Sequence, residues 1–209
     1  EGFDEAVHLV DPFEIPEAWT RWITVDFGYT NPMVMQWWAE DGDGRLFLYR
    51  ELYHTRRLVE DMAKQARGLM VYPSGKWREP APRGVICDHD AEDRATLEKH
   101  LGLRTTAAHK AVSPGLQAVQ SRLKLAGDGR PRVFIVRGAL VERDSELDAA
   151  KKPACTEEEI TGYVWAVKPG NKAGLKEEPV KENDHGMDGM RYIVAEKDLG
   201  GRPKVRWLS

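Results

Sequence analysis

Three strand-like segments follow one another near the start of the chain, and they constrain the fold more than any other feature. They are RWITVDF at 21–27, MVMQWWAE at 33–40 and RLFLYREL at 45–52. Each is rich in the β-branched, aromatic and other apolar residues typical of strands. Gly28 and the TNP sequence after it end the first segment, and DGDG at 41–44 predicts a tight turn before the third. We therefore expect an antiparallel meander.

After the meander, helical and strand-like patterns alternate. Helices are predicted at 55–70, 91–102, 113–127 and 144–152, and short strands at 83–88, 103–108 and 132–138. Ser113 is expected to cap the third of these helices, with Pro114 in its first position. A final helix should begin near Asp184, after a polar loop at 168–183 that we expect to be mobile. This order predicts an α/β domain with a mixed sheet, antiparallel on one side and parallel on the other, flanked by helices.

Length and composition favour one soluble, intracellular domain. The 209 residues, 41% of them hydrophobic, suit a domain at 21–209 preceded by a connector at 1–20. No apolar run approaches the roughly 20 residues needed to cross a bilayer, and no signal pattern begins the chain. Cys87 and Cys155 cannot build a disulfide framework, which fits a reducing compartment. The formal charge of −3 neither proves nor excludes DNA binding.

The chain has no GxxxxGK[ST] phosphate loop. In PSGKW, Trp77 stands where serine or threonine is needed. The chain also opens at Glu1 without an initiator methionine. We therefore expect a fragment of a longer protein, with any ATPase in another part of it.

Two acidic residues end strand-like segments. Asp26 lies in an otherwise apolar strand, where an ionised carboxylate without a partner costs several kcal/mol. Asp88 closes the apolar GVIC segment, and His89 and Asp90 follow it directly. If the two strands are parallel neighbours, their acids converge at one edge of the sheet.

The DHGMD sequence at 184–188 crowds further acids into the start of the last predicted helix. Asp184 and Asp188 are four residues apart and share a helix face, with His185 one step around. Gly186 and Gly189 lower helix propensity by roughly 1 kcal/mol each. The small residues would let the first turn approach a sheet closely.

A divalent cation would reconcile these unfavourable features. Mg²⁺ and Mn²⁺ prefer oxygen ligands and neutralise clustered carboxylates. Two such ions can activate water and stabilise the leaving oxygen of a phosphodiester. Each acid also has a simpler explanation: Asp26 caps a turn around Gly28, DHDAED is a solvated helix start, or Asp184 is an N-cap. The conjunction of all three favours a metal site.

Several motifs resemble the C-terminal nuclease domain of large terminase subunits, the DNA-packaging motors of tailed bacteriophages and herpesviruses. VDFGYTNP resembles the first motif of that family and GVICDHDAED the second, while KAVSPGLQAVQSRL resembles the segment that follows. EEITGYVWAV with EEPVKENDHGMDGMRY resembles the third, in which an Asp-His-x-x-Asp-x-x-Arg-Tyr helix is the most specific feature. Gly189 stands where family members commonly have alanine. The resemblance implies a ribonuclease H-like fold.

The resemblance also implies roles for individual residues. Asp26 would bridge two metals, Asp88 would hold one, and Asp184 with His185 would complete the other coordination sphere. Asp188 is a further ligand, or an acceptor that orients a ligand. Asp90 is the alternative ligand in the second motif, and we prefer Asp88 because it closes the strand. Candidate DNA contacts are Lys110, Arg122 and Lys124.

The implied activity is a metal-dependent endonuclease using two Mg²⁺ or Mn²⁺ ions. It would cut double-stranded viral DNA concatemers during packaging in the host cytoplasm, with little sequence specificity. The implied partners are an N-terminal ATPase domain, small terminase and portal, with no membrane. Two other functions stay open: a junction-resolvase type of ribonuclease H-like nuclease, and a non-catalytic DNA-gripping or portal-docking module. A zinc site of Cys87, His89 and His185 is disfavoured because no ligand pair has zinc-finger spacing.

Overall fold

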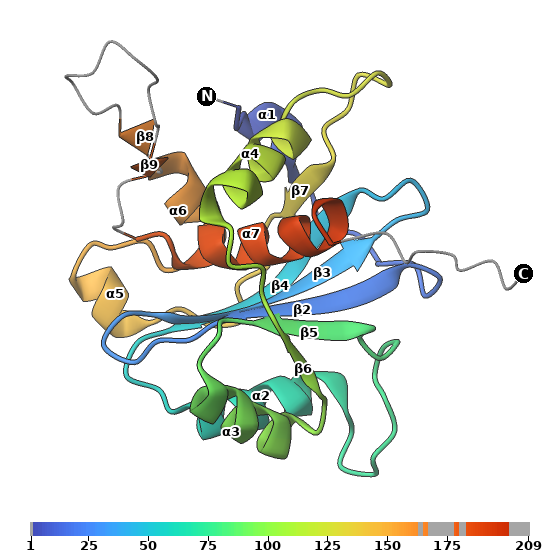
Figure 1. The fold of residues 1–209 in the computed structure, drawn as a ribbon. Coiled ribbons are helices and arrows are strands. Elements are labelled where there is room, and N and C mark those ends of the chain that lie inside the picture. Colours follow the sequence, from blue (N-terminus) through green and yellow to red (C-terminus); the bar gives the residue numbers. More distant parts are fainter. Residues whose placement is uncertain (1, 163–164, 167–177, 180–182, 201–209) are drawn as a thin grey trace, which may run out of the picture.

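A seven-stranded mixed sheet forms the centre of the computed structural model, which describes residues 2–162, 165–166, 178–179 and 183–200 (Figure 1). Its strands are β1 (Leu9–Val10), β2 (Thr20–Asp26), β3 (Met33–Glu40), β4 (Leu46–His54), β5 (Gly84–Cys87), β6 (Thr105–Ala107) and β7 (Val133–Val136). They lie in the order β1-β7-β4-β3-β2-β5-β6. A separate antiparallel pair consists of β8 (Trp165–Ala166) and β9 (Glu178–Pro179).

The predicted meander occupies the middle of this sheet. β3 pairs antiparallel with β2 and β4, whereas β5 and β6 extend the sheet in parallel beyond β2. The expected mixed α/β sheet is therefore confirmed. One detail differs, because parallel strands lie on both sides of the meander. β7 returns to the free edge of β4, where Leu46 and Val133 are partners, and β1 adds to β7.

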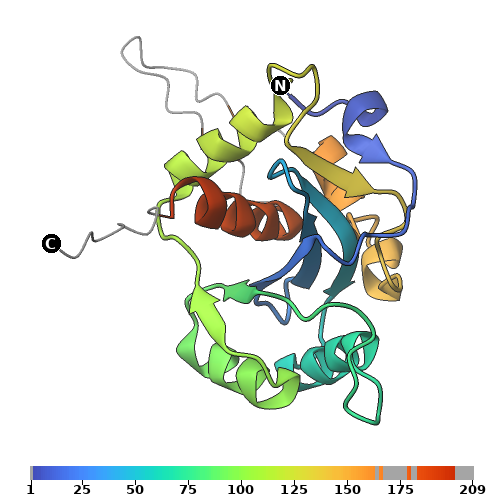
Figure 2. The ribbon, with the colours of Figure 1, turned by 90° about the vertical axis from the view of Figure 1, so that its right-hand side faces the viewer.

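Helices cover both faces of the sheet (Figures 1 and 2). They are α1 (Glu5–His8), α2 (Val59–Met70), α3 (Ala91–Leu101), α4 (Val112–Leu123), α5 (Ser145–Ala149), α6 (Thr156–Gly162) and α7 (His185–Asp198). Helices α4 and α7 pack on one face, where Val119, Met190 and Ile193 are buried against the sheet. Helices α2 and α3 pack on the other, with Met62 and Leu97 in a second core. Fully burying one such side chain contributes about 1.5–3 kcal/mol.

The segment before β2, interpreted as a connector, joins the sheet. Leu9 of β1 pairs with Ile135 of β7. The buried side chain of His8 places its Nε2 2.8 Å from the carbonyl oxygen of Leu123. Residues 8–10 therefore pack with the domain.

The prediction of Ser113 as the N-cap of α4 is wrong, because the helix begins before this residue. Helix α4 begins at Val112, so Ser113 lies in its first turn; Ala111 is at the N-cap position and makes no side-chain cap bond. Most of the polar loop predicted at 168–183 lies outside the described residues. Among the helices that the structure describes, none is long and apolar enough to span a membrane.

Candidate active site

Asp26 and Asp88 are brought together at the ends of neighbouring parallel strands. Val25 of β2 is the partner of Cys87 of β5, and the Asp88 amide donates to the Val25 carbonyl at 3.1 Å. Residues at matching positions of parallel strands point to the same face of the sheet. Both carboxylates therefore belong to the face that α7 covers. Asp26 is only 7% exposed, and Asp88 is half-buried.

Helix α7 presents three side chains to this pair of acids. The Tyr192 hydroxyl donates to Asp26 Oδ1 at 2.8 Å, and His185 Nδ1 lies 3.0 Å from Asp26 Oδ2. Residues seven apart share a helix face, and Asp188 lies between them on the same face. The guanidinium of Arg191 donates to Asp188 Oδ1 through Nε at 2.9 Å. One helix face thus contacts Asp26 twice and adds another acid beside it.

The carboxylates destabilise each other's charged forms. Burial raises the pKa of Asp26, the hydrogen bonds from His185 and Tyr192 oppose that rise, and the charge of Asp88 adds to it. Burial also raises the pKa of Asp188 to about 6, against the nearby Arg191. Ionised carboxylates in this position are unfavourable without a counter-charge.

The negative charges that disfavour ionised carboxylates favour the charged, protonated form of His185. Burial lowers its pKa, but the hydrogen bond and charge of Asp26, with further contributions from Glu159 and Asp184, leave the pKa above its ordinary value. A protonated imidazole is therefore favoured beside the buried carboxylate of Asp26.

Asp184 stands at the N-cap position of α7 but does not cap it. Its side chain makes no capping hydrogen bond with the helix. The carboxylate of Glu159, on α6, accepts from the amides of Gly186 at 2.9 Å and Met187 at 2.7 Å. The simpler explanation of Asp184 as a helix cap is therefore not what the structure shows.

Two glycines let α7 pack closely on the sheet and on α6. A Cβ atom on Gly189 would lie 2.4 Å from Oε1 of Gln36, and one on Gly186 would lie 2.3 Å from Oγ1 of Thr156. Gln36 is fully buried on β3 and accepts a hydrogen bond from the Thr24 hydroxyl at 3.0 Å. The alanine common in the related motif would press on this amide. The glycines therefore allow the close approach that the sequence predicted.

The loop after Asp26 is equally tight. A Cβ atom on Gly28 would lie 2.5 Å from the carbonyl oxygen of Pro32 and 2.6 Å from that of Asn31. Backbone atoms cannot move aside as a side chain can, so the turn that ends β2 requires glycine.

The alternative acid of the second motif has a structural role. Asp90 is exposed and is the N-cap of α3, where its Oδ1 accepts from the amides of Glu92 and Asp93 at 3.0 and 2.9 Å. Asp88, in contrast, lies beside Asp26. The geometry therefore favours Asp88 as the functional acid of this segment.

The zinc alternative is wrong for geometric reasons. Cys87 is buried in the core beneath α2 and α3, on the opposite face of the sheet from His185. His89 is exposed. These three side chains therefore do not face a common point.

The candidate DNA contacts are spread over and beside α4. Lys110 and Lys124 are exposed, and Lys124 lines a surface recess of about 600 Å³. Arg122 instead donates to Asp198 through Nη2 at 2.7 Å and to the Gly44 carbonyl at 2.9 Å. Arg122 thus ties α4 to the end of α7 and to the turn before β4.

The residues at the site fit a divalent cation by their chemistry. They supply hard carboxylate oxygens, which Mg²⁺ and Mn²⁺ prefer. As the side chains are placed, no three His, Cys, Asp or Glu groups within the described ranges converge as a metal site. Asp26 Oδ1 accepts from the Tyr192 hydroxyl, and Asp26 Oδ2 lies within hydrogen-bond distance of His185 Nδ1. Asp88 Oδ1 accepts from the His89 amide at 2.6 Å.

Two residues in this arrangement were not identified as functional from the sequence. Tyr192 belongs to the third motif but has no role assigned from it, and its helical spacing of seven from His185 was the available signal. Glu159 lies in a short helix that was not predicted. Nothing local in the sequence distinguishes it from its neighbours Glu157 and Glu158.

The sheet and its two helical layers have the fold of the terminase nuclease domain, a ribonuclease H-like fold. The large terminase of a thermophilic bacteriophage, in complex with ADP, aligns with a TM-score of 0.69 and 21% identity, over 95% of this chain and 44% of that chain. Another crystal form of that terminase gives 0.68 and 20%, over 96% and 44%. The P22 large terminase nuclease domain gives 0.61 and 16%, over 91% and 87%.

At these low sequence identities, the structural alignments show a shared fold. This chain spans less than half of the thermophilic phage protein but is comparable in extent to the P22 nuclease domain. No protein-family model matches the chain, and no curated protein matches it.

Proposed function

We propose that this chain is the nuclease domain of a large terminase and cleaves double-stranded DNA with the help of divalent metal ions. The observation that carries the proposal is the placement of Asp26 beside Asp88 under the face of α7 that bears His185 and Asp188. This occurs within a fold shared with terminase nucleases. Three segments distant in sequence thus supply acids to one region.

Mg²⁺ or Mn²⁺ would be held by Asp26, Asp88 and Asp184 with His185, and Asp188 is a further candidate. When bound, the ions would supply an activated water and stabilise charge on the leaving oxygen of the phosphodiester. Each oxygen of Asp26 has one hydrogen-bonding contact, to His185 or to Tyr192, and keeps a second lone pair that could coordinate an ion.

The protein's own residues orient the acids. Tyr192 fixes one oxygen of Asp26, and Arg191 fixes Asp188 by hydrogen bonds. The glycines of α7 keep these groups close to the strand ends. Hydrogen bonds to metal-binding side chains commonly set the orientation of these side chains, and removing such bonds lowers metal affinity or activity.

The structural similarity to large terminases also supports a proposed role in viral genome packaging. The substrate would be concatemeric viral DNA, cut with little sequence preference during genome packaging in the host cytoplasm. The thermophilic phage structures are of a longer large terminase, with nucleotide bound in one of those compared above. This supports a whole protein in which an ATPase domain accompanies the nuclease, with small terminase and portal as partners.

The direct test is incubation of supercoiled plasmid with the protein in Mn²⁺, Mg²⁺ or chelator. We expect nicking and linearisation only with metal, and loss of cutting in Asp26→Ala and Asp184→Ala. Asp11→Ala is the control, because that side chain is 93% exposed. Equal cutting by all variants would reject the site. Cutting restricted to four-way junctions would indicate a resolvase, and DNA binding without any cutting would indicate a gripping module.

A further inference from the structure

The first turn of α7 is capped from a different helix. With Asp184 at the N-cap, Gly186 and Met187 are the second and third residues of α7. Their amides are the two that an N-cap side chain normally accepts. Glu159 takes both of them, one with each carboxylate oxygen, at 2.9 and 2.7 Å. The natural partners of an Asp184 cap are therefore already occupied.

Glu159 is itself held in place. It is 1% exposed, and its Oε2 also accepts from the Tyr53 hydroxyl at 2.8 Å. Three donors converge on this carboxylate, and a negative charge is favourable at a helix N-terminus. Burial raises the pKa of Glu159 to about 8, and these three hydrogen bonds offset only part of that rise.

The helix that carries Glu159 is anchored on the sheet. Thr156, the first residue of α6, donates to Glu51 of β4 through its amide at 2.9 Å and its hydroxyl at 2.6 Å. Gln36 of β3 donates to the Thr156 hydroxyl at 2.7 Å and to the Gly186 carbonyl at 2.9 Å. The first turn of α7 is therefore fixed at its amides and at a carbonyl by groups outside the helix.

An aspartate at an N-cap would otherwise turn its carboxylate back onto the helix. That bond typically stabilises a helix, so the tendency is strong wherever the second and third amides are open. A carboxylate engaged in this way has fewer oxygen lone pairs for another partner. In α7 both of these amides bond to Glu159, and the Asp184 side chain makes no capping bond.

We propose that Glu159 is a positioning residue that caps α7 in place of Asp184 and so keeps the Asp184 carboxylate available to bind a divalent ion. This rests on the proposed nuclease function. Glu159 does not contact the metal or DNA itself. It acts through the amides of Gly186 and Met187.

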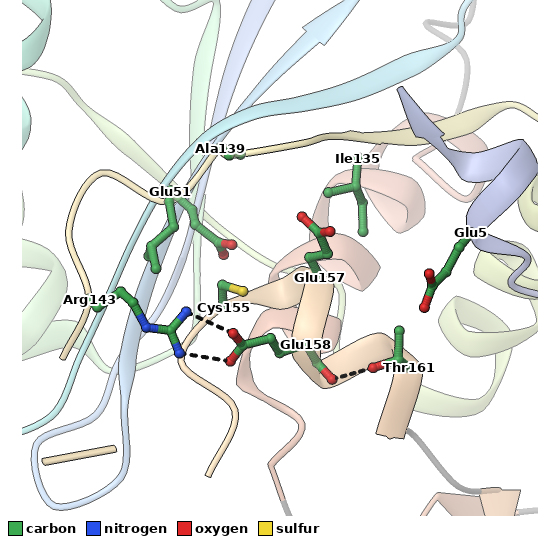
Figure 3. Close-up of a pocket in the computed structure, with 11 residues that line it drawn as sticks. Glu5, Glu51, Ile135, Ala139, Arg143, Cys155, Glu157, Glu158 and Thr161 are labelled. Carbon is green, nitrogen blue, oxygen red and sulfur yellow. Dashed lines mark hydrogen bonds and ion pairs between the residues drawn. The ribbon is translucent and has the colours of Figure 1, made fainter. Parts of the chain in front are cut away.

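The neighbouring glutamates of α6 provide a matched control. Glu157 and Glu158 line a pocket of about 340 Å³ with Glu51 and Arg143, on another side of α6 (Figure 3). Glu158 pairs with Arg143 at 2.7 Å. Glu157→Gln therefore removes a carboxylate from the same helix without touching α7.

The experiment measures Mn²⁺ binding by calorimetry for the parent, Glu159→Gln, Glu159→Ala and Glu157→Gln, with thermal unfolding to verify folding. Glutamine retains one acceptor and tests the role if alanine disrupts folding. We expect roughly 10- to 100-fold weaker Mn²⁺ binding in the Glu159 variants, as for other residues that orient ligands. Faster hydrogen exchange at the Gly186 and Met187 amides should accompany it. Glu157→Gln should match the parent.

A double-mutant cycle separates positioning from general destabilisation. In an Asp184→Ala background, Glu159→Ala should weaken Mn²⁺ binding little further, because the group that it positions is gone. A full additional loss in that background, or unchanged Mn²⁺ binding in both Glu159 variants, would overturn the proposal. If either of these outcomes is found while the parent binds Mn²⁺ and cuts DNA, the positioning role of Glu159 is rejected and the proposed nuclease function stands. If the parent does neither, the proposed function fails with it.

Discussion

The Tyr192 hydroxyl donates a 2.8 Å hydrogen bond to Asp26 Oδ1, joining the last helix to the first long strand. The other oxygen of Asp26 lies 3.0 Å from Nδ1 of His185, two helical turns earlier. Both oxygens of one buried carboxylate are thus oriented by a single helix face. The position of α7 therefore determines how Asp26 is presented.

Asp26→Asn should separate function from stability. Asparagine keeps the shape of the side chain and an oxygen for Tyr192, and it removes a buried charge next to Asp88. Because burial raises the pKa of Asp26, ionising this carboxyl group costs more in the folded protein than in water. We expect DNA cutting to fall at least about 100-fold, while thermal unfolding occurs at the same temperature or higher. A clear loss of stability would instead assign the carboxylate a structural role.

Tyr192→Phe should weaken the orientation of Asp26 while leaving the ring in place. Loss of one buried hydrogen bond should lower the free energy of unfolding by about 1 kcal/mol. We expect cutting to fall roughly 10-fold or more, as for other groups that orient ligands. Plasmid cleavage rates and urea denaturation measure the two effects. Cutting at the parental rate would show that the hydroxyl does not orient Asp26 for catalysis.

Gly186→Ala tests the close contact between α6 and α7. The added Cβ would lie 2.3 Å from Thr156 Oγ1 and 3.0 Å from its Cβ, so either α7 or the Thr156 side chain must shift. We expect a loss of about 1–3 kcal/mol in the free energy of unfolding, together with reduced cutting.

Gly68→Ala is the control for Gly186→Ala. Gly68 is exposed in α2, and a Cβ there meets no atom within 4 Å. This change should stabilise the protein by about 0.5–1 kcal/mol through helix propensity. Destabilisation of equal size at both positions would argue against a steric role for Gly186.

The titration of Glu51 should lower the stability of the protein as pH rises. Burial raises its pKa to about 7, although the Thr156 amide and hydroxyl lower it. Between the ordinary carboxyl value and about 7, the unfolded state has lost this proton while the folded state keeps it. The free energy of unfolding therefore decreases with pH over this window, by up to about 3 kcal/mol from this group.

Glu51→Gln removes that titration, so the free energy of unfolding of the variant relative to the parent should increase between pH 5 and pH 7. Urea denaturation at pH 5, 6, 7 and 8 gives both curves. Parallel curves for parent and variant would contradict the assignment.

The meander and most helices could be predicted because their apolar periodicity is local. The convergence of Asp26 and Asp88 was predicted only on the condition that their strands are parallel neighbours, and the pairing of β2 with β5 meets that condition. The second parallel edge could not be predicted, because the pairing of β7 with β4 depends on a long crossover rather than on either strand's composition.

The details of the site depend on contacts between distant segments. Glu159 belongs to a run of three glutamates, and only its burial against α7 sets it apart. Asp90 and Asp184 resemble helix caps equally well by residue type. Asp90 caps α3, whereas the corresponding amides of α7 bond to Glu159 and not to Asp184. Tertiary packing makes this difference, and residue type does not encode it.

Whether the three acids share a metal can be seen by anomalous diffraction at the manganese edge, from crystals of this domain soaked in Mn²⁺. We predict anomalous density among the carboxylates of Asp26, Asp88 and Asp184. Manganese bound elsewhere, or no bound manganese among these carboxylates, would contradict the proposed site.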